Sequence, residues 1–158
     1  MDVSRNLIPS HFIVALLQGF YWFDEGLQNY LGAKHWPEIT RPQSMLMANL
    51  ALGVTRPSDM ARRLGVSRQT VHVTLAQMVE KGVLTLVDDP EDRRMKVVAL
   101  TPLGAKMKAD AQRAMDLMVE ELSRRIGPRR VAQLNAVNPD EWGPPMTFED
   151  VPRPRQKS

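Results

Sequence analysis

Apolar residues between positions 9 and 31 recur at spacings of three and four, which is the period of an amphipathic helix. We therefore expect a long helix over residues 9–31. Its apolar face is wide enough to be buried against more than one partner. One stripe of this face holds Phe12, Leu16, Phe20, Phe23, Leu27 and Leu31, and a neighbouring stripe holds Ile13, Leu17 and Tyr21.

Shorter segments with caps and terminators follow this helix. Thr40 is a hydroxyl cap with Pro42 just after it, and Gly65 and Gly82 are residues at which helices end. Between two of these helices the residues Gly65-Val66-Ser67 form a tight turn. Three further helices are therefore expected, at residues 40–52, 58–64 and 67–81.

The next segment changes from helical to strand period. Two β-prone runs, 83–87 and 95–100, flank the polar stretch 88–94 and predict a hairpin. Thr101 followed by Pro102 is a helix start, because proline suits the first helical position. We expect a fifth helix over 102–126 (with the stripe Met107, Ala111, Met115, Met118 and Leu122), a sixth over 129–137, and a proline-containing tail without helical or strand period over 138–158.

The order of these elements predicts the fold class. A short helix, a three-residue turn, a capped helix and a hairpin make a winged helix-turn-helix, so the protein is expected to be mainly α with a small β-hairpin wing. The capped helix would enter a DNA major groove, and its N-terminal residues would meet base edges. Its inward stripe is Val71, Leu75, Met78 and Val79, and its candidate DNA-binding residues are Ser67, Arg68, Gln69, Thr70, His72 and Val73.

Composition excludes several other classes of protein. The 158 residues are 43% hydrophobic and 25% charged with a net charge of +3, which fits a globular protein with only a mild basic bias. The absence of cysteine excludes disulfides and thiolate chemistry. The sequence shows neither a membrane-spanning apolar run nor a secretory signal, so a cytoplasmic protein is expected.

Catalysis and metal binding have no positive support in the sequence. The histidines His11, His35 and His72 form no pair at helical spacing and lie in no dense acidic cluster, so no metal site is expected. There is no nucleophile-elbow or phosphate-loop motif. We therefore expect no catalytic residues, no cofactor and no enzyme.

Residues 57–71, 78–84, 89–94 and 100–104 carry four motifs, and together these resemble the MarR family of bacterial transcription regulators. Residues 57–71 look like that family's helix-turn-helix, and 78–84 like the end of its recognition helix and its first wing strand. Residues 89–94 match the wing pattern D-x-R-D-x-R at three of four fixed places. Leu100-Thr101-Pro102-Leu103-Gly104 is similar to the family's L-T-x-x-G motif. The resemblance extends over residues 10–137.

This resemblance implies roles for the wing residues. Arg94 would enter the minor groove with Asp92 orienting it, since a narrow minor groove attracts a guanidinium; the alternative is a surface ion pair between the two. Arg93 and Lys96 would support DNA binding. Two departures from the family pattern are Glu91, which stands in place of arginine in the wing, and Val73, which stands where many relatives carry arginine.

The family also implies an assembly and a mode of regulation. The chain is expected to be one domain over 1–137, with a DNA-binding core at 40–100, homodimer helices at 9–31 and 102–137, and a separate tail at 138–158. Its partner would be double-stranded DNA with a pseudo-palindromic operator, and by family analogy it would act as a repressor. The alternative function is a winged-helix module for protein–protein interaction, which Glu91 and Val73 keep open.

Many MarR-family relatives bind a small aromatic or anionic effector in a cleft, and binding there shifts the DNA-reading heads. In this chain Trp22, Trp36 and Met45 are the candidate effector-binding residues, because aromatic and methionine side chains suit adaptable apolar sites. The same three side chains would also suit an ordinary hydrophobic core, and that alternative stays open.

Overall fold

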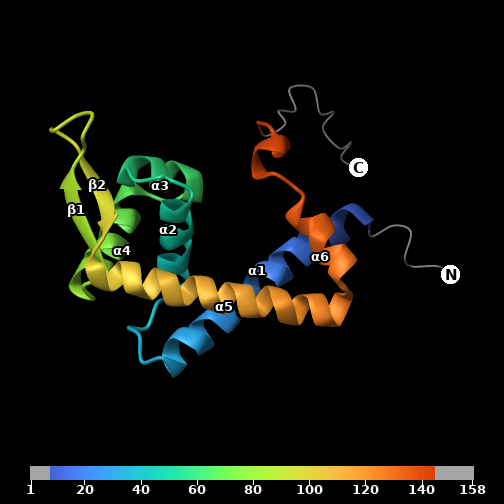
Figure 1. Cartoon of the computed structure of the whole chain (residues 1–158). Coiled ribbons are helices and arrows are strands. Elements are labelled where there is room, and N and C mark those ends of the chain that lie inside the picture. The colour runs from blue at the N-terminus through green and yellow to red at the C-terminus, as the bar shows by residue number, and fades with distance from the viewer. Residues whose placement is uncertain (1–7, 145–158) are drawn as a thin grey trace, which may run out of the picture. The chain divides into compact units, whose positions relative to one another are not determined.

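The computed structural model describes residues 8–144, and Figure 1 shows the order of their elements. The contacts divide the chain into two compact units, residues 1–118 and 119–158, so the division falls within the fifth helix. The elements are α1 (Ile8–Ala33), α2 (Arg41–Ala51), α3 (Pro57–Leu64), α4 (Arg68–Glu80), β1 (Leu84–Asp88), β2 (Lys96–Leu100), α5 (Pro102–Ile126), α6 (Pro128–Asn135) and the 3₁₀ helix η2 (Pro139–Trp142).

The predicted elements are present, and most of their boundaries lie within one or two residues of the prediction. The sequence prediction is wrong beyond Asn138, where η2 follows. The N–H of Glu141 donates to the Asn138 carbonyl over 3.0 Å, which closes one 3₁₀ turn. A single turn is too short to leave a period in the sequence. The rest of the predicted tail, 145–158, lies outside the described residues.

The hydrophobic core of the first unit gathers side chains from α2, α3, α4, the hairpin and α5. Met60 of α3 and Met78 of α4 are fully buried, and Leu46, Val83 and Met107 lie in the same cluster. This core holds the two helices of the helix-turn-helix against the base of the hairpin. In the described chain no helix is long and apolar enough to cross a membrane.

The inward face of α4 is narrower than the sequence predicted. Val71, Leu75 and Met78 are buried, as expected, but Val79 is 41% exposed. Successive helical residues are about 100° apart around the helix axis. Val79 is therefore turned away from the core, into which the preceding Met78 points. The assignment of Val79 to the inward stripe is therefore wrong.

The wing is a two-stranded antiparallel hairpin. Leu84 pairs with Leu100 at its base, and Asp88 pairs with Lys96 near its tip. The N–H of Val98 in β2 donates to the carbonyl of Thr55, just before α3, over 2.9 Å. This bond attaches the wing to the start of the helix-turn-helix.

The junction between the hairpin and α5 explains the L-T-x-x-G motif in physical terms. The Thr101 hydroxyl donates to the Gly82 carbonyl over 2.6 Å and accepts from the Gly104 N–H over 3.0 Å. A Cβ on Gly104 would overlap the backbone carbonyl of Val83. Only glycine allows α5 to approach β1 this closely.

The N-terminal half of α1 exposes a continuous set of apolar side chains within the first unit. Ile13 is 62% exposed and Leu17 is 46% exposed. Towards its C-terminal end the same helix enters the core, where Leu31 is buried. Phe12, Val14, Leu16 and Phe20 complete the exposed set.

Candidate nucleic-acid interface

The turn between α3 and α4 has the geometry that the sequence predicted. Gly65 adopts a left-handed conformation with φ of 64°, and the N–H of Val66 donates to the Ala61 carbonyl over 3.1 Å. Ser67 caps α4, because its hydroxyl oxygen accepts from the Thr70 N–H over 3.0 Å. The turn and the cap therefore fix the orientation of the first turn of α4 relative to α3.

This first turn presents its side chains to solvent. Arg68, Gln69, Thr70 and His72 are exposed, and Val73 is 47% exposed. Within residues 8–144, Arg68 makes no ion pair, so its charge is available to a partner. The arrangement brings all six predicted residues, including the Ser67 cap, to one exposed end of α4.

The opposite end of α4 is attached to α2 by a polar cluster. Gln43 is buried, and its amide nitrogen donates to Gln77 Oε1 over 3.0 Å. Its own Oε1 accepts from Lys81 Nζ over 2.9 Å and from the Thr40 N–H over 3.1 Å. The sequence reasoning missed Gln43 and Lys81; the available signal was the capping-box spacing of Thr40 and Gln43.

Just before α3, Arg56 binds two carboxylates of the loop that joins β1 to β2. Its Nε lies 2.7 Å from Oδ2 of the buried Asp89, and its Nη2 lies 3.0 Å from Oε2 of the exposed Glu91. Asp89 Oδ1 also accepts the Glu91 N–H over 2.9 Å. The hydrogen bond from Arg56 and that from the Glu91 backbone lower the pKa of Asp89 below its usual 3.8. Glu91 thus pairs with Arg56 in the place where the family pattern has an arginine.

This lowered pKa predicts a pH dependence of stability. Asp89 binds a proton less readily in the folded state than in the unfolded chain. Its charged form therefore stabilises the folded state above pH 3.8, and this contribution is lost as the pH falls through the lowered pKa of the folded state. We expect Asp89→Asn to be less stable at pH 7 but to lose less stability between pH 5 and acid than the wild type. Urea unfolding at several pH values in this range measures the free energy of unfolding of both proteins. The same dependence of this free energy on pH in both would contradict the prediction.

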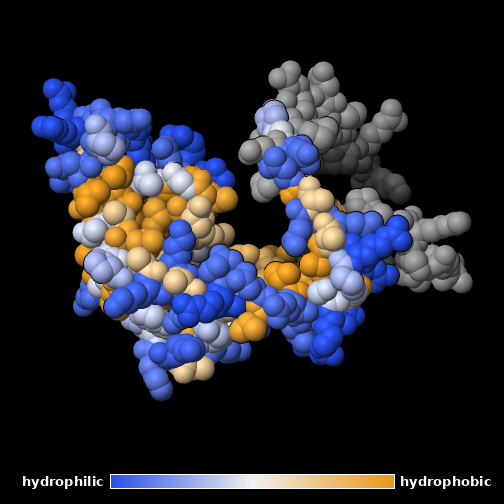
Figure 2. Space-filling view, viewed as in Figure 1, coloured by the Kyte–Doolittle hydropathy of each residue, from blue (hydrophilic) through white to orange (hydrophobic). Residues whose placement is uncertain are grey.

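At the wing tip, Asp92 orients the backbone rather than the side chain of Arg94. Asp92 Oδ1 accepts the Arg94 N–H over 3.0 Å, and the Asp92 carbonyl accepts the Met95 N–H over 2.8 Å. In the described part of the chain neither Arg93 nor Arg94 makes an ion pair. Figure 2 shows hydrophilic residues gathered over this tip. Two arginine charges are therefore exposed there.

Lys96 is placed differently from the other predicted wing cations. Its Nζ lies 2.5 Å from Asp88 Oδ1 across the hairpin, in agreement with the strand register. Both side chains are more than half exposed. Lys96 therefore has a charge partner within the wing, unlike Arg93 and Arg94.

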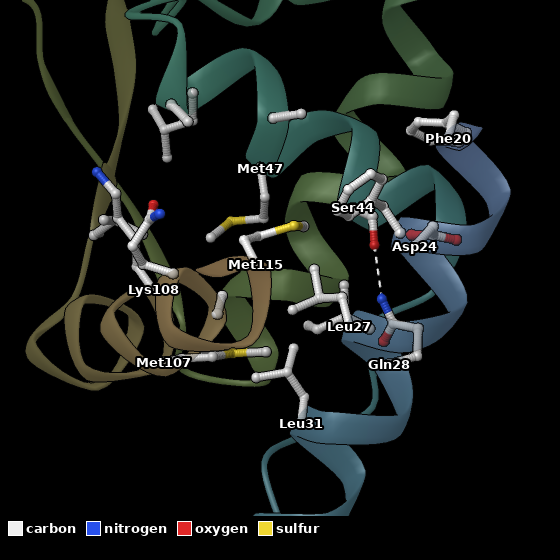
Figure 3. A pocket seen from close by; sticks show the side chains of 18 residues that line it. Phe20, Asp24, Leu27, Gln28, Leu31, Ser44, Met47, Met107, Lys108 and Met115 are labelled. Carbon is white, nitrogen blue, oxygen red and sulfur yellow. Dashed lines mark hydrogen bonds between the residues drawn. The ribbon is translucent and has the colours of Figure 1, made fainter. Parts of the chain in front are cut away.

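A cavity of about 460 Å³ lies between α1, α2 and α5, inside the first unit (Figure 3). In Figure 3, Leu27 and Leu31 of α1, Met47 of α2, and Met107 and Met115 of α5 point towards the same space. Its wall is mostly apolar, and the remaining lining residues are Phe20, Phe23, Asp24, Gln28, Ile39, Ser44, Ala48, Leu50, Ala51, Leu100, Lys108, Ala111 and Gln112.

Polar groups stand at the α1–α2 side of this cavity. The Gln28 amide donates to the Ser44 hydroxyl over 2.9 Å (Figure 3). The carboxylate of Asp24 is buried and lies 2.8 Å from Arg41 Nε. These groups are already paired, and most of the remaining lining side chains are apolar.

The three predicted effector residues are not among the side chains that line this cavity. Trp36 packs against the core, and its indole N–H donates to Asp110 Oδ2 over 2.8 Å. Trp22 makes an edge-to-face contact with Phe23, a lining residue, at 4.9 Å between ring centroids. Met45 is 40% exposed. The assignment of these three residues to an effector site stays a prediction.

A capped helix with an exposed first turn, set beside a hairpin with exposed arginines, defines the winged helix-turn-helix class of protein. Residues 38–95 match the family model described as the MarR family. This match confirms the resemblance inferred from the sequence for residues 38–95, and the elements from α2 to β2 have the winged helix-turn-helix fold. Within the described residues no group of acidic, histidine or cysteine side chains could hold a metal ion.

Several solved structures share this fold. The reduced form of MarR from E. coli is 23% identical, with a TM-score of 0.60 over 80% of this chain and 90% of its own. A mutant of MepR from S. aureus, bound to an oligodeoxyribonucleotide, is 22% identical, with a TM-score of 0.51 over 79% of this chain and 91% of its own. The regulator BldR from Sulfolobus solfataricus is 19% identical, with a TM-score of 0.56 over 85% and 95%. No curated protein matches the sequence significantly.

Proposed function

We propose that this protein is a sequence-specific, double-stranded-DNA-binding transcription regulator that acts as a homodimer. The observation that carries the proposal is the joint exposure of the α4 first turn and of Arg93 and Arg94, all without an ion pair in the described chain. The MepR mutant of the same fold is bound to an oligodeoxyribonucleotide. In this proposal α4 lies in the major groove, and the wing lies over the neighbouring minor groove.

Selection of bound sequences from a random duplex library, followed by affinity against salt, tests this function. We expect a palindromic winner, because a two-fold dimer reads two half-sites about one helical turn apart. Affinity should fall steeply with salt, since bound phosphates release counterions. Weak binding without an enriched sequence or a salt dependence would favour the protein–protein interaction module.

Arg94→Ala tests the role of the wing. We expect DNA affinity to fall about tenfold or more, because losing a groove-inserted arginine costs about 1–3 kcal/mol. The dimer should stay folded, since the Arg94 side chain makes no ion pair within the described residues. Fluorescence anisotropy with a labelled duplex measures the affinity, and circular dichroism checks the fold.

Arg113→Ala is the matched control for this change. Arg113 is an exposed arginine on α5 that pairs with Asp110 at 3.3 Å. It carries the same charge as Arg94 but lies on a helix outside the wing and α4. An affinity loss as large for Arg113→Ala as for Arg94→Ala would show a general charge effect and would overturn the wing assignment.

The proposed dimer explains the exposed apolar half of α1. An apolar face of this extent on a helix is usually covered by a partner. In the second unit, taken by itself, Leu134 and Val137 are also exposed, at 54% and 49%. A second copy of the chain could cover both surfaces, which agrees with the dimer helices predicted from the sequence at 9–31 and 102–137.

We further propose that the protein is a repressor and that a small apolar or aromatic effector, with or without an anionic group, binds in the cavity. Binding of this effector would release the protein from DNA. The volume of about 460 Å³ lies within the range of small-molecule sites. The cavity touches α2, and α2 is tied to α4 through Gln43 and Gln77. A ligand that changes the position of α2 can therefore act on the recognition helix.

Ala111→Phe tests the effector site by filling it. Ala111 lines the cavity from α5, so a phenyl ring there should exclude an aromatic probe such as anilinonaphthalene sulfonate. We expect the probe to bind the wild type and to weaken its DNA binding. In the variant, the affinity for the probe and the effect of the probe on DNA affinity should both be at least tenfold smaller. Ala105→Phe places the same ring on an exposed part of α5 and is the control. Equal probe binding by both variants would contradict the site.

A further inference from the structure

The outward face of α4 carries an unusual set of side chains for a helix that enters a DNA groove. Successive helical residues are about 100° apart. The residues opposite the buried Val71, Leu75 and Met78 are therefore Gln69, Val73, Ala76 and Glu80, and all four are exposed. This outward stripe begins with an amide, continues with aliphatic side chains and ends with a carboxylate.

The outward stripe holds no arginine or lysine. Arg68 and His72 lie on one flank of the helix, about 60° to 100° from the stripe. Guanine is read mainly by arginine or lysine, which donate to its O6 and N7 atoms. The centre of the face therefore lacks the side chains that select guanine. At the far end, Glu80 would be repelled by phosphates. The N-terminal residues of a recognition helix are the ones that meet base edges, and of the outward stripe only Gln69 and Val73 lie in the first two turns of α4.

Both remaining side chains favour A·T pairs. An amide forms two hydrogen bonds to adenine N6 and N7, and an aliphatic side chain contacts the C5-methyl group of thymine. Val73 is 47% exposed and β-branched, so its methyl groups are held in one preferred rotamer without support from neighbours. It therefore presents a rigid apolar contact.

We propose that Gln69 and Val73 are the specificity-determining residues of α4 and that they read A·T pairs, Gln69 through adenine and Val73 through the thymine methyl. This inference rests on the proposed function. The two residues are four positions apart, a rise of about 6 Å along the helix, so the base pairs they read lie within about two steps of each other. Each half-site of the operator therefore contains an A·T core.

Removal of single groups from the DNA tests this assignment. In the selected half-site, each thymine is replaced in turn by deoxyuracil, which lacks only the C5-methyl. For the wild type we expect a three- to fivefold affinity loss at one position, the size expected for one buried methyl group. Val73→Ala should bind the intact site more weakly and should not respond to deoxyuracil at that position. Val79 is another exposed valine of α4, at 41% against 47% for Val73, but it lies off the outward stripe, so Val79→Ala should respond as the wild type does.

The adenine contact is tested in the same way with 7-deazaadenine, which lacks the N7 acceptor. The wild type should lose affinity at one adenine, and Gln69→Ala should be insensitive there. This inference would be overturned by G·C pairs at these positions, or by equal sensitivity of the wild type and the variants to the altered bases. Sequence-selective binding would in that case still support the proposed function. Absence of any enriched, salt-dependent site would overturn both.

Discussion

Gly104→Ala is expected to destabilise the protein by about 3 kcal/mol, although alanine is the better helix former. The added Cβ would overlap the Val83 carbonyl oxygen, a backbone atom that cannot rotate away. α5 would have to move off the hairpin, and the Thr101 hydroxyl would lose its bonds to Gly82 and Gly104. For a chain of this size the midpoint of thermal unfolding should fall by roughly 10 °C, as measured by calorimetry.

Gly26→Ala is the matched control for this prediction. Gly26 is also a helical glycine, but its added Cβ would meet only the Sδ of Met118, near the end of a flexible side chain. Met118 can change rotamer, and alanine gains about 0.5–1 kcal/mol of helix propensity over glycine. We therefore expect a small change in either direction. If both variants unfolded at the same temperature, the close approach at Gly104 would not be the reason for glycine there.

The double variant Ile13→Glu with Leu17→Glu is expected to separate the proposed dimer and to lower DNA affinity at least a hundredfold. Two half-sites bound by one dimer benefit from an effective concentration that a monomer lacks. Glutamates at these exposed positions would place charge in an interface that must exclude water. Analytical ultracentrifugation measures the oligomeric state, and anisotropy with the selected duplex measures the affinity.

The control for this pair is Leu52→Glu. Leu52 is 63% exposed, close to the 62% of Ile13, but it is the C-cap of α2 rather than part of α1. The proposal expects it to remain dimeric and to bind DNA nearly as the wild type does. A double variant that stays dimeric with wild-type affinity would show that the apolar half of α1 has another role.

The local elements could be predicted from the sequence because their signals are local. The Ser67 cap and the Gly65 and Gly82 terminators act through backbone groups within a few residues, so they appear directly in the sequence. The same is true of the hairpin, whose strands agree with prediction to about one residue. The order of these elements was enough to indicate a winged helix-turn-helix and the exposed first turn of α4.

Contacts between distant segments could not be read in the same way. The Arg56 pair with Asp89 joins residues far apart in sequence, and so does the hydrogen bond between Trp36 and Asp110. Trp36 looked suitable for a ligand because of its chemistry, yet its ring packs against the core and its indole N–H donates to Asp110. Residue type shows what a side chain can do, but the packing of α1, α2 and α5 decides which side chains face the cavity.

By itself, the sequence determined the helices, the turn, the wing and the residues offered at the start of α4, since caps and periodicity depend on neighbours along the chain. Only the tertiary structure decided that Glu91 pairs with Arg56, that Asp92 holds the backbone of Arg94, and that methionines of α2 and α5 line the cavity. These features depend on the distances between side chains of separate elements. Such distances are set when the core packs, and no local pattern encodes them.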